Sequence, residues 1–349
     1  VKPALFNEAF MMHTSTSPQY SILASTDVSA KMMDDAGEYL TDESIGEAIA
    51  FRQAMVRLGN EVRKRKPQDW WFGVWQPDEV NGVPFADLDP QTLRQGDAWV
   101  LQPSASWHGF GDLGRDYCML DPIKVTVLTP GQTLEGQMEA SGIPAPLVSS
   151  FLSSRGIVVE KTEPYSILLL FSLGVTKGKW GSLVAGLMEF KKHYDSNASL
   201  ELVMPELVAS HGERYAGMGL KDLADAMHQD MLASKLLHNM DAAFSLLPDV
   251  VSSPRATFAK LVKGQIEQIA VRDMLDRTVA VQVVPYPPGI PLMMPGEKAG
   301  ADKQAIIDYL LAMELFDSHF PGFEHDNHGV EIERDGQGGL TYKVYVVKQ

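Results

Sequence analysis

Between residues 123 and 193, the spacing of the apolar residues changes from that of a strand to that of a helix and back again. This alternation is the sequence feature that most limits which fold the chain can adopt. Ile123, Val125 and Val127 alternate with Lys124 and Thr126, and this two-residue period is typical of a strand with one buried face. Beyond it, the patterns predict a helix over 144–155 closed by Gly156, strands over 156–162 and 165–174, and a helix over 176–193. The order β, α, β, β, α predicts a small α+β domain.

A longer helical pattern precedes these elements. Apolar residues recur there at steps of three and four, namely Ile45, Ala48, Phe51, Met55, Leu58 and Val62. The sequence DDAG at 34–37 predicts a loop, so we expect Thr41 or Asp42 to cap the helix and the basic residues 63–66 to end it. This helix is expected to cover a sheet or another helix.

A second unit is expected after the polar loop at 195–199. Its signals are a helical stripe of Leu220, Leu223, Met227 and Met231, a helix over 253–264 with a Ser cap and an early Pro, and a hairpin joined by Asp335 and Gly336. We place boundaries near residues 34 and 197. The chain starts without Met in what reads as the middle of an element, so residues 1–34 are expected to end a domain that lies upstream.

Charge and cysteine content exclude several classes of function. The 349 residues contain 30 Lys and Arg against 45 Asp and Glu, a net charge of −15, and this field repels nucleic acid and anionic membranes. Cys118 is the single cysteine, so neither an intramolecular disulfide nor a cysteine-based zinc site is expected. The apolar run over 167–175 is too short for a membrane span, and no secretory signal is present at the start of this sequence. A cytoplasmic protein is expected.

Two groups of polar residues are candidates for ligand binding. The hydroxyl run Thr14, Ser15, Thr16 and Ser17 offers donors to a phosphate, but Ser and Thr before Pro also form turns. Glu160 follows two valines, so its carboxylate is expected at the end of a buried strand. There it can pair with its own neighbours or bind the cation of a substrate.

Histidines form a third group. His319, His325 and His328, with nearby acidic residues, supply enough ligand types for a metal ion such as zinc, although the segment also reads as a polar loop. His108 lies between aromatic residues and reads as a packed side chain or a base. The sequence contains no GxSxG, P-loop or GxGxxG motif in its required context.

Several segments together resemble a known family from one end of the chain to the other. They are FNEAFMMHTSTSP (6–18), WHGF (107–110), LDPIKVTVLTPG (120–131), GIVVEKT (156–162), LPDVVSSP (247–254), VVPYPPGIPLMMPGE (283–297) and HFPGFEHD (319–326). In order and spacing they are similar to the bacterial ornithine/lysine/arginine decarboxylases. These are pyridoxal 5′-phosphate enzymes of the aspartate-aminotransferase fold, fold type I, in the α/β class with α+β domains.

The resemblance covers the C-terminal half of such an enzyme. It implies that residues 1–34 end the large cofactor-binding domain, that 35–197 form the small aminotransferase-like domain, and that 198–349 form the C-terminal decarboxylase domain. The family's Ser-x-His-Lys motif, whose lysine forms the Schiff base, does not occur in these residues. We therefore expect no catalytic residue within this sequence and expect that lysine upstream.

The resemblance also implies roles and partners. Ser15 occupies the position that reaches the cofactor phosphate of the partner subunit, with Thr14 and Thr16 beside it, and such homodimers assemble into decamers. Glu160 matches the residue that faces the distal amine in the lysine enzymes, whereas segments 171–184, 190–197 and 203–208 are more similar to the arginine enzymes. A point ammonium suits one carboxylate, and a guanidinium suits a bidentate partner. Lysine conversion to cadaverine and CO2 is therefore favoured.

Three alternatives stay open. The first is decarboxylation of arginine to agmatine. The second is a non-catalytic assembly or regulatory module, since the Schiff-base lysine is absent from this sequence. The third is a metal-dependent hydrolase built on the three histidines of residues 319–328, for which we expect no bound zinc.

Overall fold

A computed structural model describes residues 2–14, 19–335 and 339–349. Its N-terminal part contains α1 (Pro3–Met11), α2 (Tyr20–Arg65), β1 (Gly73–Val74), β2 (Glu79–Val80), β3 (Val83–Pro84), α3 (Pro90–Leu93), β4 (Lys124–Leu128), α4 (Ala145–Ser153), β5 (Lys161–Glu163), β6 (Ser166–Leu170) and α5 (Lys177–Asp195). Short 3-10 turns lie at Phe85–Asp87 and Gly96–Trp99.

The C-terminal part begins with a run of helices and ends in strands. It contains α6 (Leu200–Val203), α7 (Pro205–Ser210), α8 (Gly212–Tyr215), α9 (Leu220–Ala233), α10 (Leu236–Phe244), β7 (Asp249–Val250), α11 (Pro254–Val262), β8 (Ile266–Ala270), β9 (Val284–Tyr286), β10 (Glu297–Lys298), α12 (Gln304–His319), β11 (Asp326–His328), β12 (Val330–Arg334) and β13 (Leu340–Val347). Two more 3-10 turns lie at Val271–Asp273 and Ala301–Lys303.

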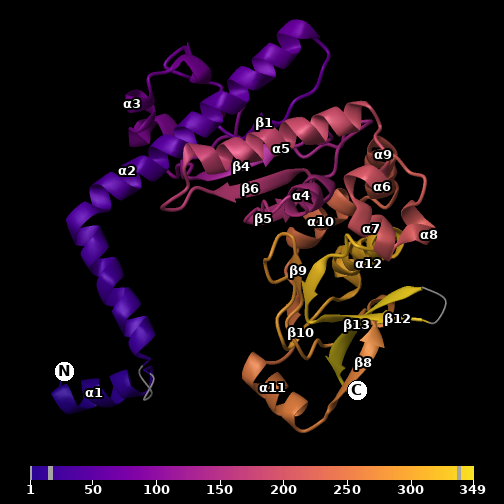
Figure 1. The fold of residues 1–349 in the computed structure, drawn as a ribbon. Coiled ribbons are helices and arrows are strands. Elements are labelled where there is room, and N and C mark those ends of the chain that lie inside the picture. Colours follow the sequence, from indigo (N-terminus) through magenta and orange to yellow (C-terminus); the bar gives the residue numbers. More distant parts are fainter. Residues whose placement is uncertain (1, 15–18, 336–338) are drawn as a thin grey trace.

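An antiparallel sheet in the order β1-β4-β6-β5 is the centre of the N-terminal part. Val125 and Val127 of β4 pair with Leu169 and Ile167 of β6, and all four side chains are buried. Figure 1 shows α2 and α5 running along this sheet, and α4 also packs against β6. The mixed α+β architecture is the one that the sequence predicted, and strands β4 and β6 and helices α4 and α5 are confirmed.

The C-terminal part has its own antiparallel sheet, in the order β12-β13-β8. Helix α12 packs on β13, and α9 and α10 pack on α12. The predicted stripe on α9 is buried, and Ser253 caps α11 by accepting a hydrogen bond from the backbone N–H of Ala256, so both predictions are confirmed. The two predicted hairpin strands also pair, with Arg334 opposite Leu340, while Gly336 lies outside the described residues.

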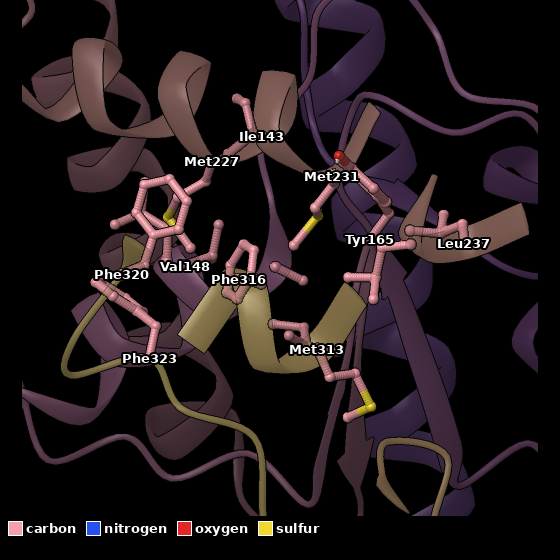
Figure 2. Packing of buried hydrophobic residues seen from close by; sticks show 14 of the residues in the cluster. Ile143, Val148, Tyr165, Met227, Met231, Leu237, Met313, Phe316, Phe320 and Phe323 are labelled. Carbon is pink, nitrogen blue, oxygen red and sulfur yellow. Dashed lines mark hydrogen bonds between the residues drawn. The ribbon is translucent and has the colours of Figure 1, made fainter. Parts of the chain in front are cut away.

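One apolar cluster continues across both parts of the chain. It contains Val148 and Tyr165 from the N-terminal part together with Met227 of α9 and Phe316 of α12. Figure 2 shows these side chains in a shared interior. A smaller cluster around Ile49, Phe85, Trp99 and Trp107 holds the segment between β1 and β4 against α2. The domain boundaries near 34 and 197 stay a proposal.

The long helix begins much earlier than the sequence predicted. Helix α2 starts at Tyr20 and runs through the DDAG sequence, so the expected loop at 34–37 is wrong. Lys31 pairs along the helix with Asp34 and Asp35, at 3.6 and 2.5 Å. Thr41 is not a cap, because its hydroxyl donates to the Gly37 carbonyl one turn earlier, at 2.8 Å. Within the described residues, no helix is both long enough and apolar enough to cross a membrane.

Candidate functional site

A cleft of about 1200 Å³ lies between the two parts of the chain. Helix α4 and residues 155–164 form one part of its lining, and residues 202–211 around α6 and α7 form another. Residues 286–287 and 322–326, from the C-terminal part, complete it. Segments more than 150 positions apart in the sequence thus meet in one concave surface that contains Glu160.

The backbone before Glu160 ends a helix and does not form the expected strand. Gly156 has φ +75°, and the Ile157 N–H donates to the Leu152 carbonyl at 3.0 Å while the Gly156 N–H donates to that of Ser153 at 2.9 Å. This is the Schellman arrangement that closes a helix with glycine. The predicted strand over 156–162 is therefore wrong for residues 156–160, since β5 contains residues 161–163.

Glu160 lies exposed in the cleft, one residue before β5. Its N–H donates to the Leu168 carbonyl at 2.9 Å, which extends the pairing of β5 with β6 by one residue. Val158 is 85% exposed, so the expectation of a buried strand before Glu160 is also wrong. Within residues 2–14, 19–335 and 339–349, no hydrogen bond or ion pair to the Glu160 carboxylate is found. The group is open to a cation.

The neighbouring cations of the cleft are bound to other carboxylates. Lys161 forms an ion pair with Glu163 at 2.5 Å, and its Nζ lies 5.9 Å from the centre of the Tyr286 ring. Arg155 holds Glu189 through two bonds, Nη2 to Oε1 at 2.8 Å and Nε to Oε2 at 3.2 Å. These bonds lower the pKa of Glu189. Neither cation is therefore paired with Glu160.

A histidine from the C-terminal part also lines the cleft. The Nδ1 atom of His325 lies 2.6 Å from Asp317 Oδ1, and the Asp317 side chain is fully buried. The Tyr342 hydroxyl donates to the other Asp317 oxygen. Burial, and then the charge of Asp317, raises the pKa of Tyr342, so the phenol keeps its proton. The sequence drew attention to His325 only as a possible metal ligand, because Asp317 and Tyr342 lie outside its segment.

The three histidines of the proposed metal site each contact a different carboxylate. His319 lies 2.5 Å from Asp230, His325 pairs with Asp317, and His328 lies 3.8 Å from Asp326. Among the residues whose structure is described, no group of three His, Cys, Asp or Glu side chains is placed to hold a metal ion. This arrangement gives no support to the metal-dependent hydrolase.

His108 is a packed side chain. It is 3% exposed, its Nδ1 accepts a hydrogen bond from the Phe110 N–H at 3.0 Å, and its Nε2 lies 2.7 Å from the Gln102 carbonyl. Both ring nitrogens are therefore used within the fold, with Nε2 as the donor. This leaves no ring nitrogen to act as a base.

Thr14, one of the candidate phosphate ligands, lies apart from the cleft. Thr14 is exposed just after α1, and Figure 1 shows α1 well separated from the strands and helices around β5. Ser15 and Thr16 lie outside the described residues. Among the described residues, the Thr14 hydroxyl reaches only a distant sulfur, Met11 Sδ at 4.0 Å, so it can donate to a phosphate oxygen. The structure does not bring Thr14 and Glu160 together.

Comparison with known proteins decides the family. Residues 1–179 match the family model described as the Orn/Lys/Arg decarboxylase major domain, and residues 237–348 match the one described as the Orn/Lys/Arg decarboxylase C-terminal domain. The chain belongs to the Orn/Lys/Arg decarboxylase family. This membership confirms the resemblance noted in the sequence.

The decarboxylase relatives include enzymes for different basic amino acids. The chain is 47% identical over 347 residues to lysine decarboxylase LdcA of Pseudomonas aeruginosa, covering 99% of this chain and 45% of the relative. It is 42% identical over 335 residues to the biodegradative arginine decarboxylase of Escherichia coli, covering 94% and 44%. The chain thus spans less than half the length of these curated relatives.

Solved structures of lysine decarboxylases share the fold. Lysine decarboxylase A from Pseudomonas aeruginosa superposes with a TM-score of 0.89 at 47% identity, covering 99% of this chain and 45% of that one. The constitutive lysine decarboxylase of E. coli gives 0.87 at 40% identity, covering 100% and 46%. The expected fold class is therefore confirmed.

Proposed function

We propose that the complete protein containing this chain decarboxylates a basic amino acid, with lysine giving cadaverine and CO2. Relatives at 47% and 40% identity are lysine decarboxylases by name. The activity is that of the whole enzyme, because the Ser-x-His-Lys motif is absent from this sequence. We therefore propose that the 349 residues alone are inactive.

Glu160 is the observation that carries the assignment of a substrate with a cationic side chain. Its carboxylate is open in the cleft, and the nearest cationic neighbour in sequence, Lys161, is paired with Glu163. A single unpaired carboxylate suits the compact ammonium at the end of a lysine side chain. A carboxylate can also hold a guanidinium through both of its oxygens, as Glu189 holds Arg155, so the choice of lysine over arginine rests on the lysine decarboxylases among the relatives. We assign Glu160 to the distal ammonium of the substrate.

Pyridoxal 5′-phosphate is the proposed cofactor. Bound to the enzyme, it acts as the electron sink for loss of the α-carboxylate. From this chain we propose that Ser15, with Thr14 and Thr16, donates hydrogen bonds to the phosphate across a subunit interface. The exposed Thr14 hydroxyl supports this role, because no protein oxygen accepts its hydrogen among the described residues.

Assembly into a homodimer, and further into a decamer, is part of the proposal. Helix α1 buries none of its residues within this chain. Large apolar side chains stand exposed on α1 and the first half of α2, including Leu5, Phe6, Phe10, Ile22, Leu23 and Val28. Such an apolar surface is typical of a protein interface. A cytoplasmic location fits the charge and cysteine content but stays a proposal.

The change Glu160→Gln in the complete enzyme tests the substrate assignment. A hydrogen bond to a charged group contributes about 1.5–3 kcal/mol, so kcat/KM for lysine is expected to fall roughly 10- to 100-fold. Glu213→Gln, an exposed carboxylate outside the cleft lining, is the matched control and is expected to change little. An unchanged kcat/KM for lysine in Glu160→Gln would refute the assigned role.

The change Ser15→Ala tests the cofactor assignment. Loss of one hydroxyl donor is expected to weaken retention of pyridoxal phosphate about three- to tenfold, measured by absorbance of the bound cofactor during dialysis. Ser25→Ala is the control, because that exposed hydroxyl donates to the Ile22 carbonyl within α2. Equal retention in Ser15→Ala and the parent enzyme would show that the Ser15 hydroxyl does not hold the phosphate.

Arginine decarboxylation to agmatine is the second candidate. It is favoured by the 42% identity to the arginine enzyme of E. coli and by the arginine-like segments of residues 171–208. A non-catalytic assembly module is the third, and an upstream reading frame that encodes the Ser-x-His-Lys motif would exclude it.

A further inference from the structure

The imidazole of His325 is held by a buried carboxylate. Besides the contact between Nδ1 and Asp317, the backbone N–H of His325 donates to both Asp317 oxygens at 3.1 Å. The Tyr342 hydroxyl adds another donor, and the Asn327 amide donates in turn to the Tyr342 oxygen at 2.9 Å. The oxygens of Asp317 thus accept from the backbone of His325, from its ring and from the Tyr342 hydroxyl.

This network determines which nitrogen of His325 is available. A carboxylate can only accept, so Nδ1 carries a hydrogen and donates it to Asp317. In a neutral imidazole the other nitrogen, Nε2, then bears the lone pair. The His325 side chain is 10% exposed, the residue lines the cleft, and no hydrogen bond to Nε2 is found among the residues that the structure describes.

The charge of the cleft determines which class of ligand can bind near Nε2 of His325. Glu160 and Glu206 line the cleft, and neither has an ion pair within the described part of the chain. Its two lining cations are neutralised, Arg155 by Glu189 and Lys161 by Glu163. The remaining field is negative and attracts cations.

We propose that Nε2 of His325 accepts a hydrogen bond from a primary ammonium group bound in the cleft. The ligand class is an alkylammonium ion, such as an amine or a basic amino acid. This position is additional to the one assigned to Glu160, and binding there does not depend on turnover. Asp317 acts as the positioning residue, because it fixes the ring and the hydrogen on Nδ1.

A second histidine provides a matched control. His319 also contacts an aspartate, with Nδ1 2.5 Å from Asp230 Oδ1, but its side chain is 46% exposed and it does not line the cleft. His319→Gln therefore makes the same chemical change as His325→Gln outside the proposed site.

The experiment titrates n-butylammonium chloride into the intact protein at about pH 8, where histidine side chains are ordinarily neutral. Nitrogen NMR of the histidine rings is expected to show a shift of His325 Nε2, and calorimetry to show about tenfold weaker binding in His325→Gln. Tetramethylammonium carries the same positive charge but has no N–H donor. It is therefore expected to leave the nitrogen resonance of His325 Nε2 unshifted. His319→Gln is expected to bind n-butylammonium as the parent does.

Three results would overturn the inference. One is a His325 resonance that does not respond to n-butylammonium in the unmodified protein, a readout that needs no variant to fold. Another is equal affinity in His325→Gln and the parent. The third is a response of the same size to tetramethylammonium. If the second result came together with weaker binding in Glu160→Gln, the proposed role of Glu160 would still stand.

Discussion

Arg52 carries a positive charge into the interior between α2 and the central sheet. The residue is 0% exposed, and its guanidinium donates to the carbonyls of Trp75, Pro122 and Lys124 at 3.0–3.2 Å. Burial lowers its pKa to about 9, against a smaller opposing effect of Asp121, so it stays charged at neutral pH. The side chain joins the helix to both ends of the segment between β1 and β4.

Replacing Arg52 by Met is expected to destabilise the protein by about 3–5 kcal/mol, because three partly buried carbonyls would lose their donor. Urea unfolding followed by circular dichroism measures this change. Arg63→Met is the control, at an exposed arginine whose side chain makes one hydrogen bond within the described residues, to Asn60 on its own helix, and it is expected to stay within about 0.5 kcal/mol of the parent. A loss below about 1 kcal/mol in Arg52→Met would contradict the account.

At the scale of elements, periodicity predicted the strands and helices that bury a regular stripe. Strand β4 and helices α4, α5 and α9 follow their apolar patterns, since burial of one face stabilises each of them. The same reasoning failed at 34–37, where Asp and Gly signal a loop but ion pairs from Lys31 support a helix. It also failed at 157–160, where apolar residues follow a helix-ending glycine.

Gly37→Ala tests whether α2 is continuous through this region. A Cβ at Gly37 would meet the flexible end of Met33, with Cε at 3.0 Å, so an alanine is expected to raise stability by about 0.5–1 kcal/mol. Thermal unfolding measures the change. Gly131→Ala is the control that is expected to lose stability. The φ angle of Gly131 is +126°, and a Cβ there would lie 2.7 Å from the Gly142 backbone. A loss of stability in Gly37→Ala would favour the loop.

At the scale of the whole molecule, the cleft is the feature that the sequence could not predict. Glu160 and His325 are separated by 165 positions, and no local sequence pattern predicts that they line the same cleft. The two parts of the chain are joined by the shared core and by a buried contact, in which the Tyr165 hydroxyl lies 2.6 Å from His228 Nδ1. Because His228 Nε2 also donates to the Glu139 carbonyl at 2.9 Å, its ring is fixed.

The candidate site was predictable only in part. Glu160 was found from its position in GIVVEKT, and its place in a cleft fits the role that the family resemblance implies. The pairing of Lys161 with Glu163, which leaves Glu160 open, depends on side-chain geometry across β5. The hydrogen-bond network around His325 joins it to Asp317 and Tyr342. It forms because α12 packs against β13, and this packing is a feature of the tertiary structure.

The most direct test of the central claim is the rate of CO2 release by the complete enzyme, loaded with pyridoxal phosphate, from lysine, arginine and ornithine. Because relatives at 47% and 40% identity are lysine decarboxylases by name, kcat/KM for lysine is expected to exceed that for arginine by at least about tenfold. A preference for arginine would contradict the assignment of Glu160 to a lysine ammonium, and no release from any of the three would contradict the proposed reaction.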